Sequence, residues 1–598
     1  MIRKLFIAAV ASVSFTTAQA QTAPVDPGAD LIVINARIYT GNRAQPEASA
    51  LAVKDGRIYS VGSDADIRGL TNPQTQVIDA GSRRLIPGII DAHTHILNDL
   101  AFNSNVRWDG VPTLRQALAM LSEQAGRTPE GQWVKVIGGW SPYQFEENRF
   151  PTLAELAEAV PNRPAIVQYA YNRAFLNKQA METLGVGTDR FPQVPDIEFE
   201  TDSNGRPTGV VHGNTWVFVA FETMVPQLSF DEQVSSIVYS VRALNRVGVT
   251  SVIDNGSRWG YPEAQTRVDV LARDNRLNVR LPFVDLQLGG GNMVDLQIEA
   301  ITEKAPISAG QNLHPTLEHG HEYRGAGEVL NAELHDHENF DRPAIIIDPE
   351  KMQRFVEQDV ARLIARRIPF RMHATYNENI TPFLEALEKV NETVPLDGLM
   401  WSLEHAETIS PENIERVRRL GGGIALDAKM ALHADGFIAT HGRELALQTP
   451  RLRMLVDSDI PVAMTTDGLR AATFNPWVGI SWMVTGKSVS GSQALADDNR
   501  LSRTEALELF TKGGAWFMDA EAELGAIAPG NLADFALLDR DYFSVPDEEI
   551  ESISSVLTVM DGRVVFGTQD YGDLSPRLPE ALPAWSPSNH FDSYYVDE

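Results

Sequence analysis

Short apolar runs alternate with stretches of helical periodicity through the long central part of the chain. The apolar runs occupy residues 87–92, 248–253, 279–284, 369–373, 399–405, 422–426 and 461–465. The helical stretches occupy residues 113–125, 230–247, 348–366, 380–390 and 411–420. Such alternation predicts parallel strands covered by helices. The number and spacing of the units favour a (β/α)8 TIM barrel over residues 87–518 rather than an open sheet.

The two ends of the chain show the period-two alternation that is typical of strands. This pattern occupies residues 31–40, 50–61, 76–79, 84–86, 533–538 and 556–565. Asp-Gly pairs within it predict hairpin turns. Because the two distant segments share this alternation of apolar and polar residues, we expect one small β domain built from residues 21–86 and 519–570. The alternation of apolar runs and helical stretches is interrupted at residues 131–218, which predicts an inserted lobe. The Pro-rich residues 571–598 predict an irregular tail.

Residues 1–20 have the pattern of a signal peptide rather than that of a membrane anchor. Arg3 and Lys4 precede a short apolar run, and Ala18 and Ala20 form a small-x-small cleavage site. The run is too short to span a bilayer, which needs about 18 or more apolar residues. We therefore expect an exported protein, periplasmic or secreted, without a membrane anchor after signal removal.

Composition narrows the kinds of site and partner that the chain can have. It contains no cysteine, which excludes thiolate nucleophiles, disulfides and thiolate metal sites. Its 51 Lys and Arg against 80 Asp and Glu give a net charge of −29, which disfavours a nucleic-acid or anionic-membrane partner. We expect a small-molecule substrate, and the sequence leaves the oligomeric state open, a homo-oligomer included.

Histidine or aspartate follows several of the predicted central strands. The first strand runs directly into His93 and His95, which share one strand face because their spacing is two. His373, His405 and Asp467 end three further runs. A single histidine at a strand end is more often structural, but the group together predicts a site for a divalent metal, with zinc favoured.

The sequence resembles the amidohydrolase superfamily, and within it the amidohydrolase-3 group, which includes N-substituted formamide deformylases and uncharacterised exported members. The matching stretches are LIVINARIYTG, PGIIDAHTHI, GGW followed by RFPTLAEL, MHATYNENI, LEHAETIS, TTDGLRAATFNPW and LGAIAPGNLADFALLD. They cover nearly all of the chain after the signal peptide. The resemblance implies a distorted (β/α)8 barrel with a small β-sandwich formed from both chain ends.

The resemblance also implies roles for the strand-end residues. His93 and His95 would bind one metal, His373 and His405 would bind a second where one is present, and Asp467 would contact the first metal and act as general base.

This chain departs from the family pattern at the fourth strand. Many members carry a carboxylated lysine there, which bridges two metals, whereas the segment 323–330 of this chain has no lysine. Glu328 occupies the expected place and could bridge instead, and a simple surface carboxylate is the alternative. The number of metals, one or two, stays open at this point.

Other polar or aromatic residues fall in segments expected to flank the pocket. The candidates for substrate binding are Trp140, Arg324, Asp427, Lys429 and Arg470. Each has an alternative role in packing or in an ordinary ion pair. His319 and His321 form a second His-x-His, but no apolar strand precedes them, which favours a polar loop.

Together with these residues, the resemblance implies an enzyme that hydrolyses a non-peptide C–N bond, in an amide or formamide. The predicted chemistry is attack by metal-bound hydroxide, with Asp467 as general base. An ester or lactone hydrolase, or a deaminase, would use the same residues. An exported binding protein without catalysis is a further alternative, and it predicts that a metal ligand is missing.

Overall fold

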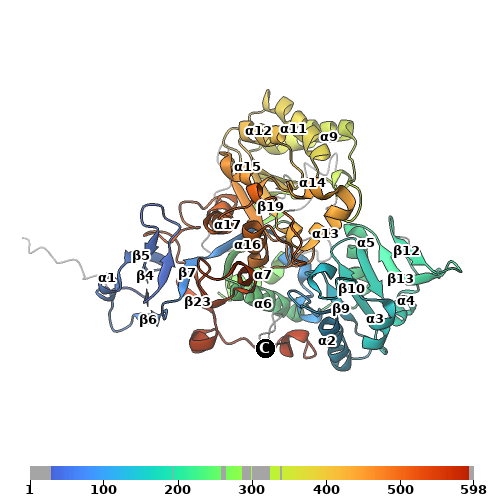
Figure 1. The fold of residues 1–598 in the computed structure, drawn as a ribbon, viewed down its shortest axis with the longest axis horizontal. Coiled ribbons are helices and arrows are strands. Elements are labelled where there is room, and N and C mark those ends of the chain that lie inside the picture. The colour runs from blue at the N-terminus through green and yellow to red at the C-terminus, as the bar shows by residue number, and fades with distance from the viewer. Residues whose placement is uncertain are drawn as a thin grey trace, which may run out of the picture.

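The computed structural model describes residues 28–192, 194–256, 264–285, 298, 323–336 and 340–591 (Figure 1). The predicted signal peptide, His319 and His321 lie outside the described residues. Within the described ranges, none of the helices combines the length and the apolar character needed to cross a membrane.

A parallel sheet forms the centre of the molecule, with eight strands among the described residues. The strands follow one another in chain order across the sheet, and their bounds are β8 Ile89–Thr94, β14 Val249–Asp254, β15 Phe283–Asp285, β16 Tyr323–Ala326, β17 Phe370–Ala374, β18 Trp401–His405, β19 Gly423–Asp427 and β20 Val462–Thr465. Beyond their carboxyl ends, the outer strands β8 and β20 meet. Asp467 N–H donates to His93 O at 3.1 Å, and His95 N–H donates to Gly468 O at 2.8 Å.

Each apolar run predicted from the sequence contains at least part of a central strand, but none of the runs contains β16, which only the family resemblance placed in segment 323–330. The sequence of β16, YRGA, carries no apolar run. Gly325, at a φ of 142°, packs so closely on β17 that an added Cβ would lie 2.3 Å from Pro369 O. Gly327, at a φ of 126°, packs in the same way against Arg371 O. These glycines permit a close approach of β16 to β17 that a side chain would prevent.

Helices connect and cover the central strands (Figure 1). They include α6 Phe230–Arg246, α7 Gln265–Arg273, α11 Asn377–Asn391, α12 Pro411–Leu420, α13 Lys429–His441 and α16 Pro476–Thr485. Local signals define their ends. In α12, Ser410 caps the first turn and Gly421 adopts a left-handed conformation after the last, with φ 69°.

The two ends of the chain pair with each other. One sheet has the order β5-β4-β1-β6, and a second has the order β23-β22-β21-β7-β2-β3. Their bounds are β1 Leu31–Ile34, β2 Arg37–Tyr39, β3 Glu47–Ala48, β4 Ala50–Lys54, β5 Arg57–Gly62, β6 Gln76–Asp79, β7 Arg84–Pro87, β21 Phe535–Leu538, β22 Ser555–Met560 and β23 Arg563–Gly567. The antiparallel pairing of β7 with β21 joins the early strands to the late ones.

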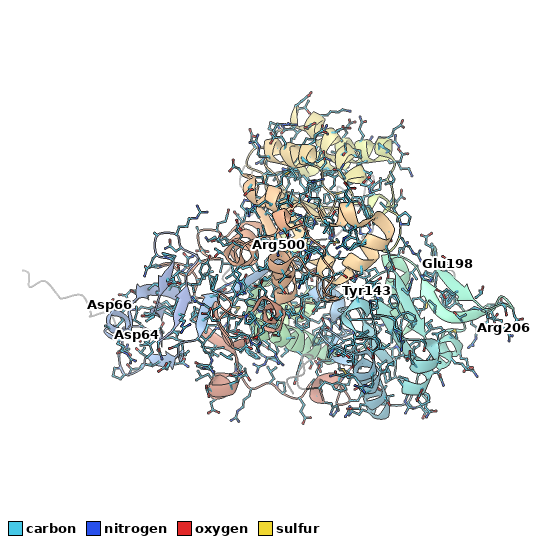
Figure 2. All side chains as sticks on the ribbon, viewed as in Figure 1. Asp64, Asp66, Tyr143, Glu198, Arg206 and Arg500 are labelled. Atoms are coloured by element: carbon cyan, nitrogen blue, oxygen red, sulfur yellow. The ribbon has the colours of Figure 1, made fainter. Side chains whose placement is uncertain are left out.

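The segment after β8 folds into a lobe beside the central sheet. Its sheet has the order β12-β13-β11-β10-β9, with bounds β9 Val134–Ile137, β10 Ala165–Tyr169, β11 Arg173–Leu176, β12 Glu198–Thr201 and β13 Pro207–His212. The helix α2, Leu114–Arg127, packs against this lobe in one hydrophobic cluster with β9 and β10. In Figure 2, Glu198 and Arg206 on this lobe lie at the opposite end of the molecule from Asp64 and Asp66.

A buried ion pair joins the central sheet to the chain-end sheet. The Arg280 guanidinium, just before β15, contacts both carboxylate oxygens of Asp534, just before β21, at 2.8 and 3.0 Å. Both side chains are almost fully buried, at 4% and 3% exposed.

Removing Asp534 should therefore be strongly destabilising. Asp534→Ala leaves the buried Arg280 guanidinium with the half-exposed Asp561 carboxylate, 3.5 Å away, in place of its paired partner. We therefore expect a loss of roughly 3 kcal/mol in the free energy of unfolding, at the lower end for a broken buried pair. Urea unfolding would measure it. Glu388→Ala, which breaks the partly exposed pair with Arg419, is the control and should change stability little. Equal effects of the two variants would contradict the structural role of the buried pair.

Candidate metal centre

The predicted ligands converge at the carboxyl ends of the central strands, and every one of them is buried. They are His93 and His95 at the end of β8, Glu328 after β16, His373 in β17, His405 in β18 and Asp467 after β20. Parallel strands bring residues that lie far apart in the sequence to one edge of the sheet, which is where barrel enzymes hold their catalytic groups.

The Glu328 carboxylate lies between two pairs of histidines. Its Oε1 is 3.0 Å from His95 Nε2 and 3.4 Å from His93 Nε2. Its Oε2 is 2.9 Å from His405 Nε2 and 3.1 Å from His373 Nδ1. Burial alone would raise the pKa of Glu328, but the charge of His93 and hydrogen bonds from His373 and His405 hold it well below its usual range. Glu328 is therefore an ionised carboxylate with one oxygen facing each histidine pair.

Two buried atoms beside the pair His93 and His95 have no hydrogen-bond partner among the described residues. They are His93 Nε2 and Asp467 Oδ1, and they lie 3.7 Å apart. His95 Nε2 lies 3.3 Å from the same Asp467 oxygen. Buried polar atoms are nearly always satisfied, and two imidazole nitrogens with a carboxylate oxygen suit a divalent metal. The residues present therefore fit a metal ion at this point.

A second layer of acidic residues holds the remaining histidine nitrogens. Glu404 Oε2 lies 2.7 Å from His93 Nδ1, and it also accepts from Asn255 Nδ2 at 3.0 Å. Burial would raise the pKa of Glu404, but Arg371 and His93 lower it below its usual value. Because Nδ1 of His93 is occupied in this way, Nε2 is the nitrogen left to face the Glu328 side.

Asp336 holds a ring nitrogen of His373, in the second histidine pair His373 and His405, as Glu404 holds one of His93. Its Oδ1 lies 3.2 Å from His373 Nε2, and the carboxylate also accepts from the backbone N–H groups of Thr375 and Tyr376. The side-chain amide of Asn379 donates to it at 2.9 Å. His373 therefore presents Nδ1 to Glu328.

Asp427 and Lys429, predicted to bind substrate, contact metal-ligand candidates instead. Asp427 Oδ2 makes a short contact with His405 Nδ1, and Thr465 donates to Oδ1 at 2.5 Å. Lys429 Nζ lies 2.6 Å from Asp467 Oδ2 and 3.3 Å from Asp427 Oδ2. Burial opposes ionisation of Asp427, but His405 and Lys429 lower its pKa. Both side chains thus orient the centre, and Lys429 leaves Asp467 Oδ1 facing His93 and His95.

Trp140 lies in the lobe, and Arg470, which follows β20, contacts residues next to it. The Trp140 indole is buried, donates to Gln168 O at 2.9 Å and packs against Trp108. This placement favours the packing alternative for Trp140. Arg470 forms a short ion pair with Glu222, in α5 Thr215–Met224, and lines a pocket together with Lys135 and Gln168.

Arg324 lies in β16, four residues before Glu328, and lines a different pocket near the amino ends of the strands. This location separates Arg324 from the carboxyl-end site where the sequence analysis placed it.

Three buried acids of the site were missed by sequence reasoning: Glu404, Asp336 and Glu407. Glu404 and Glu407 flank His405 in the stretch LEHAE, which was the available signal for them. Burial raises the pKa of Glu407 to about 8, and neither of its carboxylate oxygens has a hydrogen-bond partner in the described part of the chain. For Asp336, no pattern in the sequence points to His373.

Comparison with known proteins agrees with this geometry. A family model described as "Amidohydrolase family" matches residues 76–566. N-substituted formamide deformylase from Arthrobacter pascens is 25% identical over 568 residues, which cover 89% of this chain and 97% of that protein.

Solved structures share the fold. An uncharacterized metal-dependent hydrolase from Pyrococcus horikoshii OT3 has a TM-score of 0.58 at 17% identity, covering 87% of this chain and 99% of its own. An atrazine chlorohydrolase from Arthrobacter aurescens TC1, solved with zinc, has a TM-score of 0.51 at 15% identity, covering 92% and 97%. The chain thus shares its fold with these two proteins.

Glu404 should tune metal binding without touching the metal. Glu404→Gln removes the charge that holds His93 Nδ1, and we expect the metal affinity to fall about 10–100-fold. Competition with a chelator, followed by elemental analysis, measures this. Glu407→Gln is the matched control, because Glu407 is also a buried acid near His405, but its carboxylate oxygens have no hydrogen-bond partner among the described residues. Equal affinities of Glu404→Gln and wild type would contradict the role of Glu404.

Proposed function

The chain belongs to the amidohydrolase family, and from this premise we propose that it hydrolyses a non-peptide C–N bond, in an amide or a formamide. The observation that carries the proposal is the convergence of His93 Nε2, His95 Nε2 and Asp467 Oδ1 beside the Glu328 carboxylate. The similarity to a protein named N-substituted formamide deformylase supports the choice of bond.

The proposal includes a closed architecture. The hydrogen bonds between the ends of β8 and β20 support closure of the central sheet as a distorted (β/α)8 barrel over residues 87–518. The inserted lobe would span about residues 131–218, with α2 packed against it. The chain-end sheets would form a β-sandwich from residues 21–86 and 519–570.

The centre would hold two divalent ions, and zinc suits its nitrogen and carboxylate donors. His93, His95 and Asp467 would hold one ion, and His373 and His405 the other. Glu328 would lie between them, in the place of the carboxylated lysine of other family members. When bound, the metal supplies a Lewis acid that activates water and polarises the scissile carbonyl.

The protein residues supply the proton transfers. Asp467 takes a proton from the attacking water at Oδ1 and delivers it to the leaving nitrogen. Lys429 Nζ, 2.6 Å from Oδ2, holds the carboxylate so that Oδ1 stays on the side of His93 and His95. Asp427 fixes the ring of His405 through Nδ1. Burial of all these groups limits competing solvent.

Other reactions on the same residues differ in the substrate only. An ester or lactone hydrolase or a deaminase would use the same groups, because substrate choice depends on the surrounding loops. All the predicted ligand residues are present at the centre, whereas a binding protein that had lost catalysis would lack one.

We also propose that the protein is exported, on the evidence of residues 1–20. N-terminal sequencing of the protein recovered from the periplasm or the medium should begin at Gln21. Recovery of a chain that starts at Met1 and stays in the cytosol would contradict export.

Asp467→Asn should abolish turnover while metal stays bound. The amide keeps an oxygen donor but cannot accept the proton, so we expect kcat to fall by about 10²–10⁴-fold. Elemental analysis should find about two equivalents of divalent metal in both proteins. The assay is a screen of amides, formamides and esters, with His93→Ala as the blank.

Three results would count against this scheme. Near wild-type turnover of Asp467→Asn would refute the general-base role. About one equivalent of metal in the wild-type protein would refute the bridging role of Glu328, while a lack of any metal-dependent activity would refute the hydrolase itself.

A further inference from the structure

The segment that follows Asp467 is buried along its whole length. Residues 468–473 lie between β20 and α16, and all of them are buried. Asp467 itself has a φ of 49°, in the left-handed region that residues other than glycine rarely adopt. Such a conformation persists when the surrounding contacts hold the backbone in place. The contacts of segment 468–473 therefore bear on the position of the Asp467 carboxylate.

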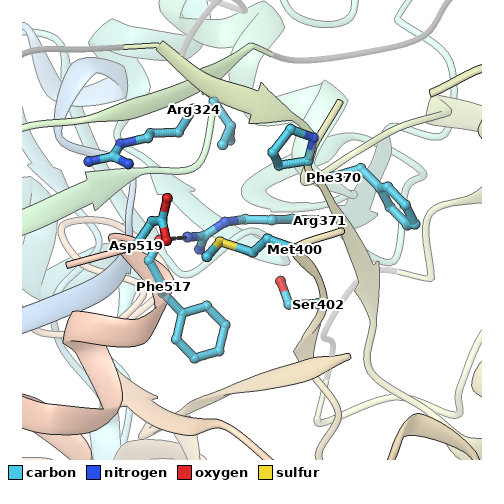
Figure 3. A pocket seen from close by; sticks show the side chains of 9 residues that line it. Arg324, Phe370, Arg371, Met400, Ser402, Phe517 and Asp519 are labelled. Atoms are coloured by element: carbon cyan, nitrogen blue, oxygen red, sulfur yellow. Dashed lines mark hydrogen bonds between the residues drawn. The ribbon is translucent and has the colours of Figure 1, made fainter. Parts of the chain in front are cut away.

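The central sheet holds the beginning of this segment. His95 N–H, at the end of β8, donates to Gly468 O at 2.8 Å. Strand β8 is supported in turn by Arg371, drawn in Figure 3, whose guanidinium donates to Ala92 O at 2.7 Å. The residue next to Asp467 is thus tied to the strand that carries the first histidine pair.

The next two carbonyl groups of the segment accept hydrogen bonds from the side of the inserted lobe. Arg107 Nη2 donates to Leu469 O at 2.9 Å, and Gly139 N–H donates to Arg470 O at 3.1 Å. Arg107 runs beside the lobe sheet, because the N–H of the residue before it donates to Lys135 O in β9 at 2.8 Å. The lobe therefore contacts the backbone of segment 468–473 directly.

A buried ion pair and the GGW stretch place these two donors. Asp109 accepts from Nε and Nη2 of Arg107 at 2.9 and 3.2 Å, and both side chains are fully buried. Gly138 and Gly139 have φ values of 59° and 76°, and a Cβ added to them would overlap Arg470 and Arg107, respectively. Glycine at both positions thus permits the close approach of the lobe to the segment.

The third carbonyl is reached through a tyrosine of the lobe. His433 Nε2, in α13, lies 3.2 Å from Ala471 O, and His433 Nδ1 lies 2.7 Å from the Tyr169 hydroxyl, in β10. A carbonyl oxygen only accepts, so Nε2 must carry the proton, and the hydroxyl donates to Nδ1 of the neutral ring. His433 follows Lys429, which contacts Asp467 Oδ2, by one turn on the same helix face. Helix α13 therefore contacts both Asp467 and the segment after it.

We propose that the inserted lobe is a positioning element for Asp467, with Arg107, His433 and Tyr169 as positioning residues. Their hydrogen bonds hold the carbonyl groups of residues 469–471, so the Asp467 backbone keeps its left-handed conformation and its carboxylate keeps its orientation toward the metal ligands. The inference rests on the proposed function, in which Asp467 is the general base. It assigns to the lobe a part in catalysis, although the lobe supplies none of the proposed metal ligands.

The kinetic test uses the metal-loaded mature enzyme and a substrate from the screen. Tyr169→Phe removes one hydroxyl and should lower kcat about threefold to tenfold with KM nearly unchanged. His433→Leu removes the donor to Ala471 O and should lower kcat about tenfold to a hundredfold. His433→Gln keeps a side-chain N–H donor and should restore most of this loss. Tyr571→Phe, at a comparably buried tyrosine whose hydroxyl donates to Asp79 O in the chain-end sheets, is the matched control and should have the wild-type kcat.

A second measurement does not depend on turnover. Hydrogen–deuterium exchange of peptides that cover residues 466–475 should be about threefold to tenfold faster in Tyr169→Phe and His433→Leu, because the segment opens more often when a hydrogen bond is lost. Peptides from the chain-end sheets should exchange as in the wild-type protein. Tyr571→Phe should leave the exchange of residues 466–475 unchanged.

Three results would overturn the proposal. One is unchanged exchange of residues 466–475 in both variants. Another is faster exchange with a wild-type kcat in both. The third is a rise in KM with unchanged kcat, which would make His433 a substrate-binding residue. A wild-type protein that is inactive on every compound would instead refute the hydrolase reaction, and faster exchange in the variants would then still support the hold of the lobe on this segment.

Discussion

The centre of this protein depends on one buried carboxylate, that of Glu328, which faces a histidine pair on each side. A buried charge is tolerated only when it is paired. The backbone supports this arrangement directly, because Glu328 N–H donates to Asn255 O and Glu328 O accepts from His373 N–H. Gly325 and Gly327 allow the strand before it to lie close to β17. The need to place the Glu328 carboxylate between the histidines thus accounts for the glycine-containing sequence of β16 and the turn after it.

A second set of charges holds the ligands in a defined orientation. Glu404, Asp336 and Asp427 each contact the ring nitrogen that faces away from Glu328, in His93, His373 and His405 respectively. Such contacts select the tautomer and raise the basicity of the other nitrogen. Lys429 does the equivalent for Asp467, whose two oxygens therefore have different partners. The geometry of the centre is consequently set by residues that would not touch the metal.

The sequence reveals the parts of this arrangement that carry a periodic or local signal. His93, His405 and Asp467 could be found because each follows an apolar run that had to be a strand. The strand β16 could not, because glycine and arginine give no apolar period, and Glu328 was found only through the missing lysine of a resembling family. Glu404 and Asp336 were missed because nothing in the sequence distinguishes a buried acidic residue from an exposed one. Lys429 was selected from the sequence as a substrate-binding candidate, and its contact with Asp467 could not be foreseen because it depends on how β19 and β20 lie side by side.

The pairing of β7 with β21 has a consequence for the order in which the molecule is made. Strand β7 continues through Gly88 into β8, which carries His93, while β21 begins only at Phe535. A ribosome must therefore synthesise the whole central sheet before β7 meets β21, whereas its other neighbour, β2, precedes it in the chain. Pairing at such a distance is slow to form. Until then β7 presents an open strand edge, and a chain that stops before β21 would keep that edge available for aggregation.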